Sequence, residues 1–402
     1  MLTIEQALDG ILTRIQPLSV VELPLLEARG LALAEDAIAG APIPTFAASA
    51  MDGYAVRAAD TAGAAGDAPV PLRVVGEAAA GVVFSHGIGP GEAVRIFTGA
   101  PVPTGCDAVV MQEVTRREGD TVLVLEPVAP GRHIRPVGND VAEGATVLPA
   151  GMALNPAALG MLAAMGHATV RAYRRPRVAI LSTGDELAAP GEALGPGRIY
   201  DSNRVSLHAQ ALEAGAEVAA SVHVPDRAEA IREALASFEG MDGILSSGGV
   251  SVGDYDLVKD ILAEGGDVAF WKVAIKPGKP LAFGHYRGVP LFGLPGNPVS
   301  ATVTFEVFVR PALRRMMGHA DVFRPTVTAT LDEGFQRSPG RREYVRALLR
   351  FEDGRYHVRP IGEQDSAVMS GMARADALII VPEDAERLEP GQAVVVLPLS
   401  HP

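Results

Sequence analysis

Cysteine is almost absent from this chain, and its scarcity excludes two kinds of site. Cys106 is the only cysteine among 402 residues. One thiol cannot form an internal disulfide, and it cannot build a cysteine-rich zinc centre. Such a composition suits a reducing compartment, so we expect a cytoplasmic protein.

Long apolar runs and an excess of basic residues are missing as well. No stretch reaches about 18 uninterrupted apolar residues, so no membrane span is expected. The opening MLTIEQALDG lacks the basic segment and the apolar run of a signal peptide. The formal net charge of −13 argues against a nucleic-acid-binding protein, which needs a basic surface. A local basic pocket for a small anion remains compatible with that charge.

Length and hydrophobic content predict a folded protein of several domains. With 402 residues and 48% hydrophobic content, the chain exceeds one ordinary core, and we expect two to four domains. Residues 1–172 are predicted to form an irregular N-terminal region of two interleaved subdomains, the β-rich one near 55–136. Residues 173–320 are predicted to form an α/β domain with a central parallel sheet, and residues 321–402 a small β-barrel.

Strands and helices alternate in the central region, which is typical of a parallel sheet. Asp226 and Glu229 stand at capping-box spacing, and Asn297 and Pro298 are typical of a helix start. Buried strands are predicted at 177–181, 221–224, 243–247 and 289–294, and helices at 202–215, 226–238, 255–263 and 295–318.

The C-terminal region reads as β structure. Residues 344–361 are typical of a hairpin, with Asp353 and Gly354 at its tip. Two further strands, at 377–382 and 393–399, are enough for a small barrel or a sandwich, and we predict the barrel. Short helices are expected near 3–16 and 156–165 in the N-terminal region.

Three unusual segments follow strands of the central region. They are STGDEL (182–187), SSGGVSVGDYD (246–256) and LPGNPVSA (294–301). Open α/β sheets bind ligands beyond the carboxyl ends of their strands, so we expect the segments to converge on one site. Gly248 and Gly249 would bring bare backbone N–H groups to an anion such as phosphate.

Carboxylates accompany these glycines, and each has a structural and a functional interpretation. Asp254 and Asp256 suit Mg²⁺, which binds one or two carboxylates together with substrate phosphates. We favour a helix cap for Asp254 and a functional role for Asp256, because one cap does not explain two acids. For Asp185 the two interpretations are equally compatible with the sequence, and for Asp226 we favour a helix cap.

Lysine is rare, and its distribution is uneven. The 35 basic residues include only four lysines, Lys259, Lys272, Lys276 and Lys279. Three of them fall in WKVAIKPGK (271–279), which indicates a site that needs compact ammonium charges. Such a cluster suits a doubly anionic substrate or an oxyanion such as sulfate or molybdate. Arg341 and Arg342 are further candidate anion ligands.

Two motifs stand out in the N-terminal region, ASAMDGYAVR (48–57) and IFTGAPVP (96–103). Asp52 in the first of them is, on physical grounds alone, a turn aspartate more often than a catalytic one.

Taken together, these segments resemble the molybdopterin molybdenumtransferase family, which includes MoeA and the enzymatic part of gephyrin. The resemblance covers essentially the whole chain and is carried by SAMDGYAVR, TGAPVP, STGDEL, SSGGVSVGDYD with Lys259, FWKVAIKPGKP and GLPGNPVSA, in this order. It implies that the central domain binds molybdopterin, that molybdate is inserted into adenylated molybdopterin with release of AMP, and that Mg²⁺ assists. It also implies a homodimer with a site shared between chains, and contacts with other molybdenum-cofactor biosynthesis proteins.

The resemblance also implies roles for individual residues. Asp256 and Glu186 match metal-site acids, and the division of labour between Asp254 and Asp256 stays open. The other catalytic matches are Asp226, Lys272 and Lys276 in the central domain and Asp52 and Asp140 in the N-terminal region, the latter two acting with Thr98 on the partner chain's site. The substrate-binding matches are Gly248, Gly249, Ser251, Lys279, Pro295 and Pro298, with Arg342 and Ser366 as looser matches.

Three alternatives share parts of this pattern. A molybdopterin adenylyltransferase would consume ATP and release pyrophosphate, but that activity needs only the α/β domain. A scaffold protein built on the same fold is disfavoured because the chain has no long linker and no second α/β domain. A nucleotide pyrophosphatase is disfavoured by SAMDGYA and by the predicted barrel.

Overall fold

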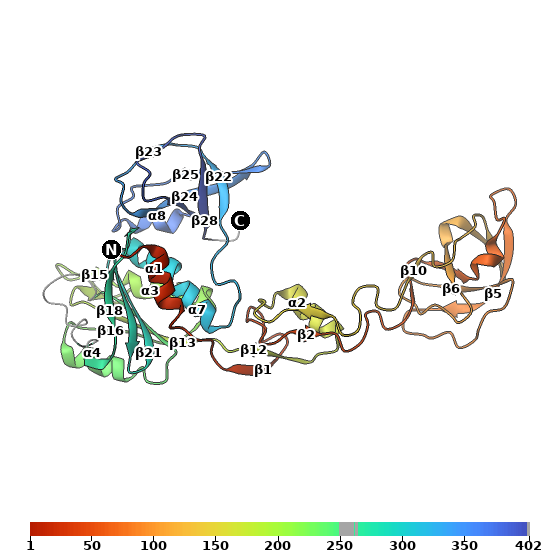
Figure 1. Cartoon of the computed structure of the whole chain (residues 1–402), viewed down its shortest axis with the longest axis horizontal. Helices are drawn as coiled ribbons and strands as arrows, with labels where there is room; N and C mark the ends of the chain where they lie inside the picture. Colours follow the sequence, from red (N-terminus) through yellow and green to blue (C-terminus); the bar gives the residue numbers. More distant parts are fainter. Residues whose placement is uncertain (249–260, 262–263, 400–402) are drawn as a thin grey trace. The chain divides into compact units, whose positions relative to one another are not determined.

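The structure is a computed structural model of the chain and describes residues 1–248, 261 and 264–399 (Figure 1). It divides into two compact units. The first unit comprises Met1–Glu35, Ala150–Pro156 and Thr169–Pro402, and the second comprises Asp36–Pro149 and Ala157–Ala168.

A six-stranded sheet with the order β16-β13-β17-β21-β20-β18 lies at the centre of the first unit. The first four strands are parallel, which confirms the predicted α/β architecture. β20 and β18 run antiparallel to their neighbours, which the sequence did not indicate. The strands are β13 (Arg177–Thr183), β16 (Glu217–Val224), β17 (Gly243–Ser247), β18 (Ala269–Lys272), β20 (Pro280–Tyr286) and β21 (Val289–Leu294).

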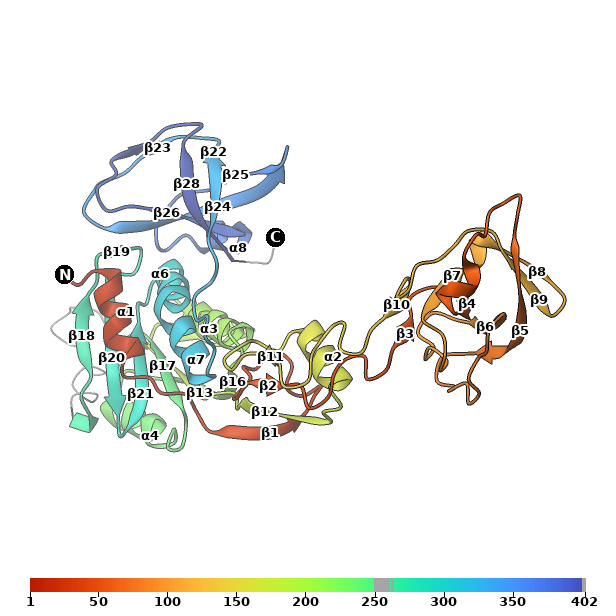
Figure 2. The ribbon, with the colours of Figure 1, turned by 45° about the vertical axis from the view of Figure 1, so that its right-hand side comes forward.

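Helices cover both faces of this sheet (Figure 2). Side chains of α1, α3, α6 and α7 share one apolar core with the sheet, whereas α4 packs on the opposite face through Ile231 and Leu235. The helices are α1 (Ile4–Leu12), α3 (Ser202–Glu213), α4 (Ala228–Ala236), α6 (Pro298–Thr304), the π-helical turn η3 (Phe305–Val309) and α7 (Arg310–Met316). The unit also has the short strands β1 (Val20–Pro24), β12 (Thr169–Tyr173), β14 (Leu187–Ala188) and β15 (Ile199–Tyr200).

The first helix packs with this α/β core. α1 begins after Thr3, which forms a capping box with Gln6, and it buries Ile4 and Ile11 among residues of the sheet. We expected the N-terminal region to begin at residue 1, but its first helix packs with the central α/β domain. The other predicted domain edges stay predictions.

One predicted helix cap is wrong. Asp226 does not cap α4, because Arg227 occupies the N-cap position and makes no side-chain cap bond. The N–H of Arg227 donates to the carbonyl of Pro225 at 2.7 Å, and this turn leaves Asp226 outside the helix. The N–H of Asp226 instead donates to Asp185 Oδ1 at 3.2 Å, so two strand-end loops meet here.

The C-terminal part of the first unit is a closed barrel. Its five strands pair in the order β24-β25-β22-β28-β26, and β26 pairs back with β24, which confirms the predicted barrel. Asp353 and Gly354 both have positive φ angles at the tip of the β24–β25 hairpin, as predicted. The elements are β22 (Val327–Leu331), β23 (Phe335–Gln336), β24 (Arg342–Glu352), β25 (Arg355–Pro360), α8 (Met369–Arg374), β26 (Ala377–Val381), β27 (Arg387–Leu388) and β28 (Ala393–Pro398).

Barrel and α/β sheet are continuous in their packing and hydrogen bonding. Tyr344, Leu378 and Leu397 of the barrel belong to the same apolar cluster as the sheet. A short strand, β19 (Ile275–Lys276), pairs in parallel with the start of β24. The barrel therefore forms part of the surroundings of the lysine segment.

The second unit is built on another six-stranded sheet, with the order β7-β4-β6-β5-β9-β8. Gly53 begins β4, and a Cβ at this position would lie 1.9 Å from the carbonyl oxygen of Val110, so only glycine fits. The elements are β2 (Ala37–Ile38), β3 (Ala48–Ser49), β4 (Gly53–Val56), η1 (Ala58–Thr61), β5 (Val70–Ala78), β6 (Glu92–Ile96), β7 (Ala108–Met111), η2 (Gln112–Val114), β8 (Thr115–Glu118), β9 (Thr121–Val124), β10 (Ile134–Arg135), β11 (Thr146–Leu148) and α2 (Pro156–Ala164).

No helix within the described residues combines the length and the apolar character that a membrane crossing requires.

Candidate functional site

Two adjoining cavities open where the strands of the α/β sheet end. The first, called here the acidic cavity, has a volume of about 420 Å³ and is lined by Glu186, Asp201, Asn203 and Gly248 among others. The second, called the basic cavity, has a volume of about 520 Å³ and is lined by Lys276, Lys279, Arg341 and Ser366 among others. Gly296 and Asn297 line both, so the cavities share a wall. The convergence predicted from the strand ends is therefore present in the described part of the chain.

Gly248 occupies the end of β17 for a conformational reason. Its φ is +88°, and a Cβ there would lie 3.0 Å from the carbonyl oxygen of Thr183. Its N–H donates to the carbonyl of Leu294 at 3.3 Å. This N–H is therefore already hydrogen-bonded, and the prediction that it would be a free donor to an anion is wrong. The role left to Gly248 is to let the chain turn tightly at the rim of the acidic cavity.

Carboxylates crowd the loops beside the acidic cavity. Burial raises the pKa of Asp226, and the charges of Asp185 and Glu186 raise it further. Glu186 lines the cavity itself. No group of three or more His, Cys, Asp or Glu side chains within the described residues is arranged to hold a metal ion by itself. The local excess of negative charge nevertheless suits a cation whose remaining ligands come from a substrate.

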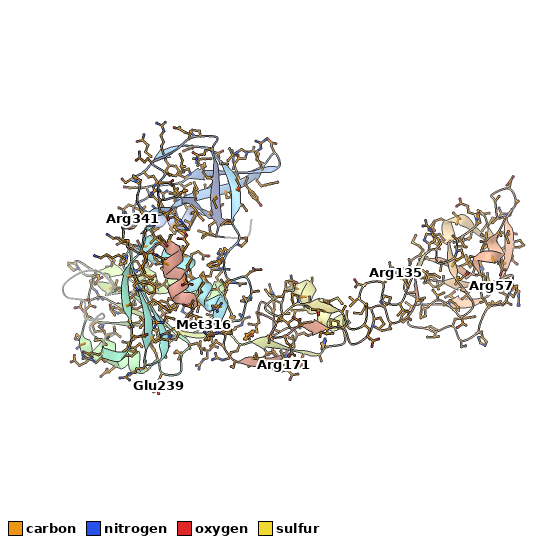
Figure 3. All side chains as sticks on the ribbon, viewed as in Figure 1. Arg57, Arg135, Arg171, Glu239, Met316 and Arg341 are labelled. Atoms are coloured by element: carbon orange, nitrogen blue, oxygen red, sulfur yellow. The ribbon has the colours of Figure 1, made fainter. Side chains whose placement is uncertain are left out.

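The basic cavity combines cations from two parts of the chain. Lys276 and Lys279 come from the segment between β18 and β20. Arg341, which is labelled in Figure 3, comes from the turn before β24 of the barrel. Pro295, predicted as a substrate-binding residue, also lines this cavity, and Pro298 lines the acidic one. Two of the three clustered lysines therefore line one cavity together with Arg341, and one carboxylate, Asp365, lines it as well. Three cations against one carboxylate are compatible with a small oxyanion, which stays a prediction.

Two predicted cations lie elsewhere. The described lining of the two cavities includes neither Lys272 nor Arg342. Lys272 ends β18 and is exposed. Arg342 forms ion pairs with Glu5 at 2.6 Å and with Glu383 at 3.0 Å. The residue before it, Arg341, takes the place in the cavity that was expected for Arg342.

Polar side chains connect the two cavities along their shared wall. Asn203 Nδ2 donates to Ser247 Oγ at 2.9 Å and to the carbonyl of Gly296 at 2.7 Å. Asn297 occupies the predicted N-cap position of α6 but makes no cap bond, and its Nδ2 donates instead to Ser366 Oγ at 2.8 Å. The helix start and the barrel loop are thereby tied together. Sequence reasoning missed Asn203, although it directly follows the start of a predicted helix.

A buried arginine shapes the barrel loop that carries Ser366. Arg346 is 1% exposed, and its guanidinium donates to Gln364 Oε1 at 3.2 Å and to the carbonyls of Val368 and Glu363 at 2.8 and 2.5 Å. Gln364 and Ser366 both line the basic cavity. Sequence reasoning missed Arg346 as well, because it alternates with apolar residues along a strand and carries no motif of its own.

Three predicted site residues belong to the second unit. Thr98 donates to Asp52 Oδ1 through its N–H at 2.7 Å and through Oγ1 at 2.8 Å. These two bonds lower the pKa of Asp52, so the carboxylate stays charged. Asp140 is exposed, and its N–H donates to the carbonyl of Ile43 at 3.0 Å. The structure brings Asp52 and Thr98 together as a pair.

Several predicted residues lie outside the described part of the chain. They are Gly249, Ser251, Asp254, Asp256 and Lys259, together with most of the helix expected at 255–263.

The fold and the two cavities together define a class of protein. This is an α/β protein with a cavity lined by Lys276, Lys279 and Arg341 at the carboxyl edge of its sheet, and residues of a β-barrel complete the lining. Three family models match the chain in succession: the MoeA N-terminal region (domain I and II) over residues 2–166, the probable molybdopterin-binding domain over 179–315, and the MoeA C-terminal region (domain IV) over 328–399.

Individual relatives extend over nearly the full length. Molybdopterin molybdenumtransferase 2 of Mycobacterium tuberculosis is 43% identical over 387 residues, which cover 94% of this chain and 95% of that protein. The molybdopterin molybdenumtransferase of Haemophilus influenzae is 38% identical over 406 residues, with coverage of 100% and 99%. The crystal structure of the molybdopterin biosynthesis MoeA protein from Pyrococcus horikoshii superposes with a TM-score of 0.85 at 33% identity, covering 99% of this chain and 100% of that one. The chain belongs to the MoeA family of molybdopterin molybdenumtransferases.

Proposed function

We propose that this chain inserts molybdate into adenylated molybdopterin and releases AMP. The observation that carries the proposal is the pair of adjoining cavities, one basic and one acidic, that share the Gly296–Asn297 wall. The reaction joins a free oxyanion to a substrate that carries phosphates. Both reactants are anionic, and they must be held close together at one site.

The basic cavity is the proposed molybdate site. A cation about 4 Å from a unit negative charge contributes ~1 kcal/mol in water but ~4 kcal/mol at the effective dielectric of a protein surface. Lys276, Lys279 and Arg341 supply three such cations, and the Ser366 hydroxyl adds a polar group at the same wall. No protein thiol is required, because the sulfurs that receive molybdenum belong to the pterin substrate.

The acidic cavity is the proposed site of the adenylate and of Mg²⁺. Mg²⁺ takes oxygen ligands and usually binds one or two carboxylates plus phosphates, which fits the carboxylates present here. Glu186 and Asp226 would hold the ion, together with Asp256 from outside the described residues. When bound, Mg²⁺ neutralises phosphate charge and polarises the anhydride that joins AMP to the pterin phosphate. Asn203 and Gly248 would shape the walls against which the adenylate lies.

We propose in addition that the enzyme is a homodimer, with Asp52, Thr98 and Asp140 acting at the partner's cavities. The resemblance to the family supports this arrangement, and the bonded pair of Asp52 and Thr98 in the second unit is compatible with it. Activity recovered on mixing an inactive Lys276 variant with an inactive Asp52 variant would support the shared site. No recovery in mixed dimers would contradict it. Other proteins of cofactor synthesis in the cytoplasm are the proposed partners.

The alternatives receive less support. An adenylyltransferase needs only the α/β domain, whereas Arg341, Gln364 and Ser366 of the barrel line the basic cavity. A scaffold protein does not require a cavity with three cations next to a cluster of carboxylates.

AMP release tests the proposal directly. With adenylated molybdopterin and Mg²⁺, the wild-type chain is expected to release AMP in a molybdate-dependent manner. Pyrophosphate formation from ATP and molybdopterin, without such release, would instead assign the adenylyltransferase activity. The absence of both would leave a binding role.

A further inference from the structure

We propose that Glu343 is a positioning residue that holds the Lys276 ammonium in place in the basic cavity. Glu343 does not line that cavity in the described structure, and it acts on the anion only through Lys276. The proposal rests on the proposed function, in which the basic cavity binds molybdate.

The contact between Glu343 and Lys276 is fixed by strand pairing. β19 and β24 are parallel, and their register places Lys276 opposite Glu343. Lys276 Nζ lies 2.8 Å from Glu343 Oε1, and the carboxylate side chain is 6% exposed whereas the lysine side chain is 36% exposed. Glu343 is therefore the more buried partner, and the Lys276 side chain extends from it to the basic cavity.

A second cation, Arg337, is buried and forms an ion pair with the other carboxylate oxygen of Glu343. Arg337 Nε lies 3.0 Å from Glu343 Oε2, and the arginine side chain is 2% exposed. Arg337 also donates to the carbonyl of Pro382 at 2.5 Å, to that of Ser338 at 3.2 Å, and to that of Arg341. The same arginine therefore anchors both Glu343 and the backbone of Arg341, another cation of the basic cavity.

This arrangement presets the geometry of the cavity. The ion pair with Glu343 holds the ammonium group of Lys276 at the cavity, where its N–H groups can donate to an oxyanion. Without the carboxylate, the flexible side chain of Lys276 would adopt many conformations in solvent. Its conformational entropy would then be lost each time an anion binds, which weakens the affinity.

The negative charge of Glu343 also has an opposite effect, because it lowers the net positive charge of the region. Arg337 already balances that charge, so we expect the loss of positioning to outweigh the loss of repulsion. If positioning dominates, neutralising Glu343 lowers the affinity for the anion, and if repulsion dominates, it raises the affinity. A binding measurement distinguishes the two effects.

Equilibrium dialysis of the full chain against molybdate is the test. Glu343→Gln is expected to weaken molybdate binding by about tenfold, which is typical for the loss of one bond between charged groups. Lys276→Ala is expected to weaken it as well, and the double variant should bind no more weakly than Lys276→Ala, because Glu343 acts through Lys276. Glu343→Asp keeps the charge but shortens the reach by one methylene, so its affinity should fall between wild type and Glu343→Gln.

Glu306→Gln is the matched control. Glu306 is another buried carboxylate in an ion pair with an arginine, Arg324, and it lies outside the described lining of both cavities. Its substitution is expected to lower stability without changing molybdate affinity. Should Glu343→Gln fail to fold, Glu343→Asp carries the same comparison against this control.

The outcomes separate this inference from the proposed function. A wild-type chain that does not bind molybdate would contradict the molybdate site itself. A wild-type chain that binds molybdate, with Glu343 variants that bind equally well or more tightly, would overturn the positioning role and leave the site intact. Additive losses in the double variant would also overturn it.

Discussion

Replacing Lys276 by alanine is expected to raise the KM for molybdate by about 50-fold. Two effects act in the same direction. The substitution removes a cation from the cavity, and it takes from the Glu343 carboxylate, which lies outside the cavity lining, one of its two cationic partners, so that the surroundings of the anion become more negative. AMP release measured over a range of molybdate concentrations gives the KM.

Arg387→Ala is the control for this prediction. Arg387 lies on β27 in the C-terminal part of the first unit, is 61% exposed and pairs with Glu389, which is 59% exposed, at 2.6 Å. Its substitution by alanine changes the net charge by the same amount as Lys276→Ala. Its KM for molybdate is expected to stay within about twofold of wild type, since exposed pairs contribute little. Comparable losses in both variants would mean that general electrostatics, and not the cavity, attract the anion.

Replacing Glu186 by glutamine is expected to lower the rate of AMP release by about 100-fold or more at ordinary Mg²⁺ concentrations. The variant removes one of the proposed carboxylate ligands from the acidic cavity while keeping its size. A large excess of Mg²⁺ should restore part of the rate, because the remaining carboxylates and the substrate phosphates still bind the ion. A titration of the AMP-release rate with Mg²⁺ measures both effects.

Glu192→Gln serves as the comparison for this second prediction. Glu192 is exposed in the loop that follows β14, accepts the N–H of Ala189 at 3.2 Å, and does not belong to the described lining of either cavity. It should keep the wild-type rate and the wild-type Mg²⁺ dependence. A Glu186→Gln variant that behaves in the same way would remove Glu186 from the site.

Local signals were sufficient to locate much of the site. The strand ends at 247 and 294 were predicted from apolar runs that stop at glycine or proline, and the first strand ends at 183, two residues beyond its predicted end. Parallel strands bring such ends together. The lysine segment was recognisable because lysine is rare elsewhere. The hairpin tip at Asp353 and Gly354 was predictable for the same kind of local reason, since two successive positive φ angles favour this dipeptide.

Long-range pairing explains what the sequence did not reveal. Glu343 and Arg346 lie on one strand, β24, and neither belongs to a recognisable motif. Only the folded barrel shows that both are buried and in contact with Lys276 and Gln364, which line the basic cavity. Arg341 lines the basic cavity whereas Arg342 pairs with Glu5 and Glu383. This difference depends on the direction in which each side chain points at the start of β24, and the local sequence does not determine that direction. Asp226 and Glu229 have the spacing of a capping box, but Asp226 does not cap α4. The turn at Pro225 places it before the helix, where its N–H donates to Asp185.

The location of bound molybdate tests the central claim most directly. Crystals of the full chain soaked in molybdate would be measured at the molybdenum absorption edge. We predict an anomalous peak in the basic cavity, within bonding distance of Lys276, Lys279 and Arg341, and its disappearance in Lys276→Ala crystals. Molybdenum bound elsewhere on the protein, with the basic cavity empty, would contradict the assignment of the two cavities.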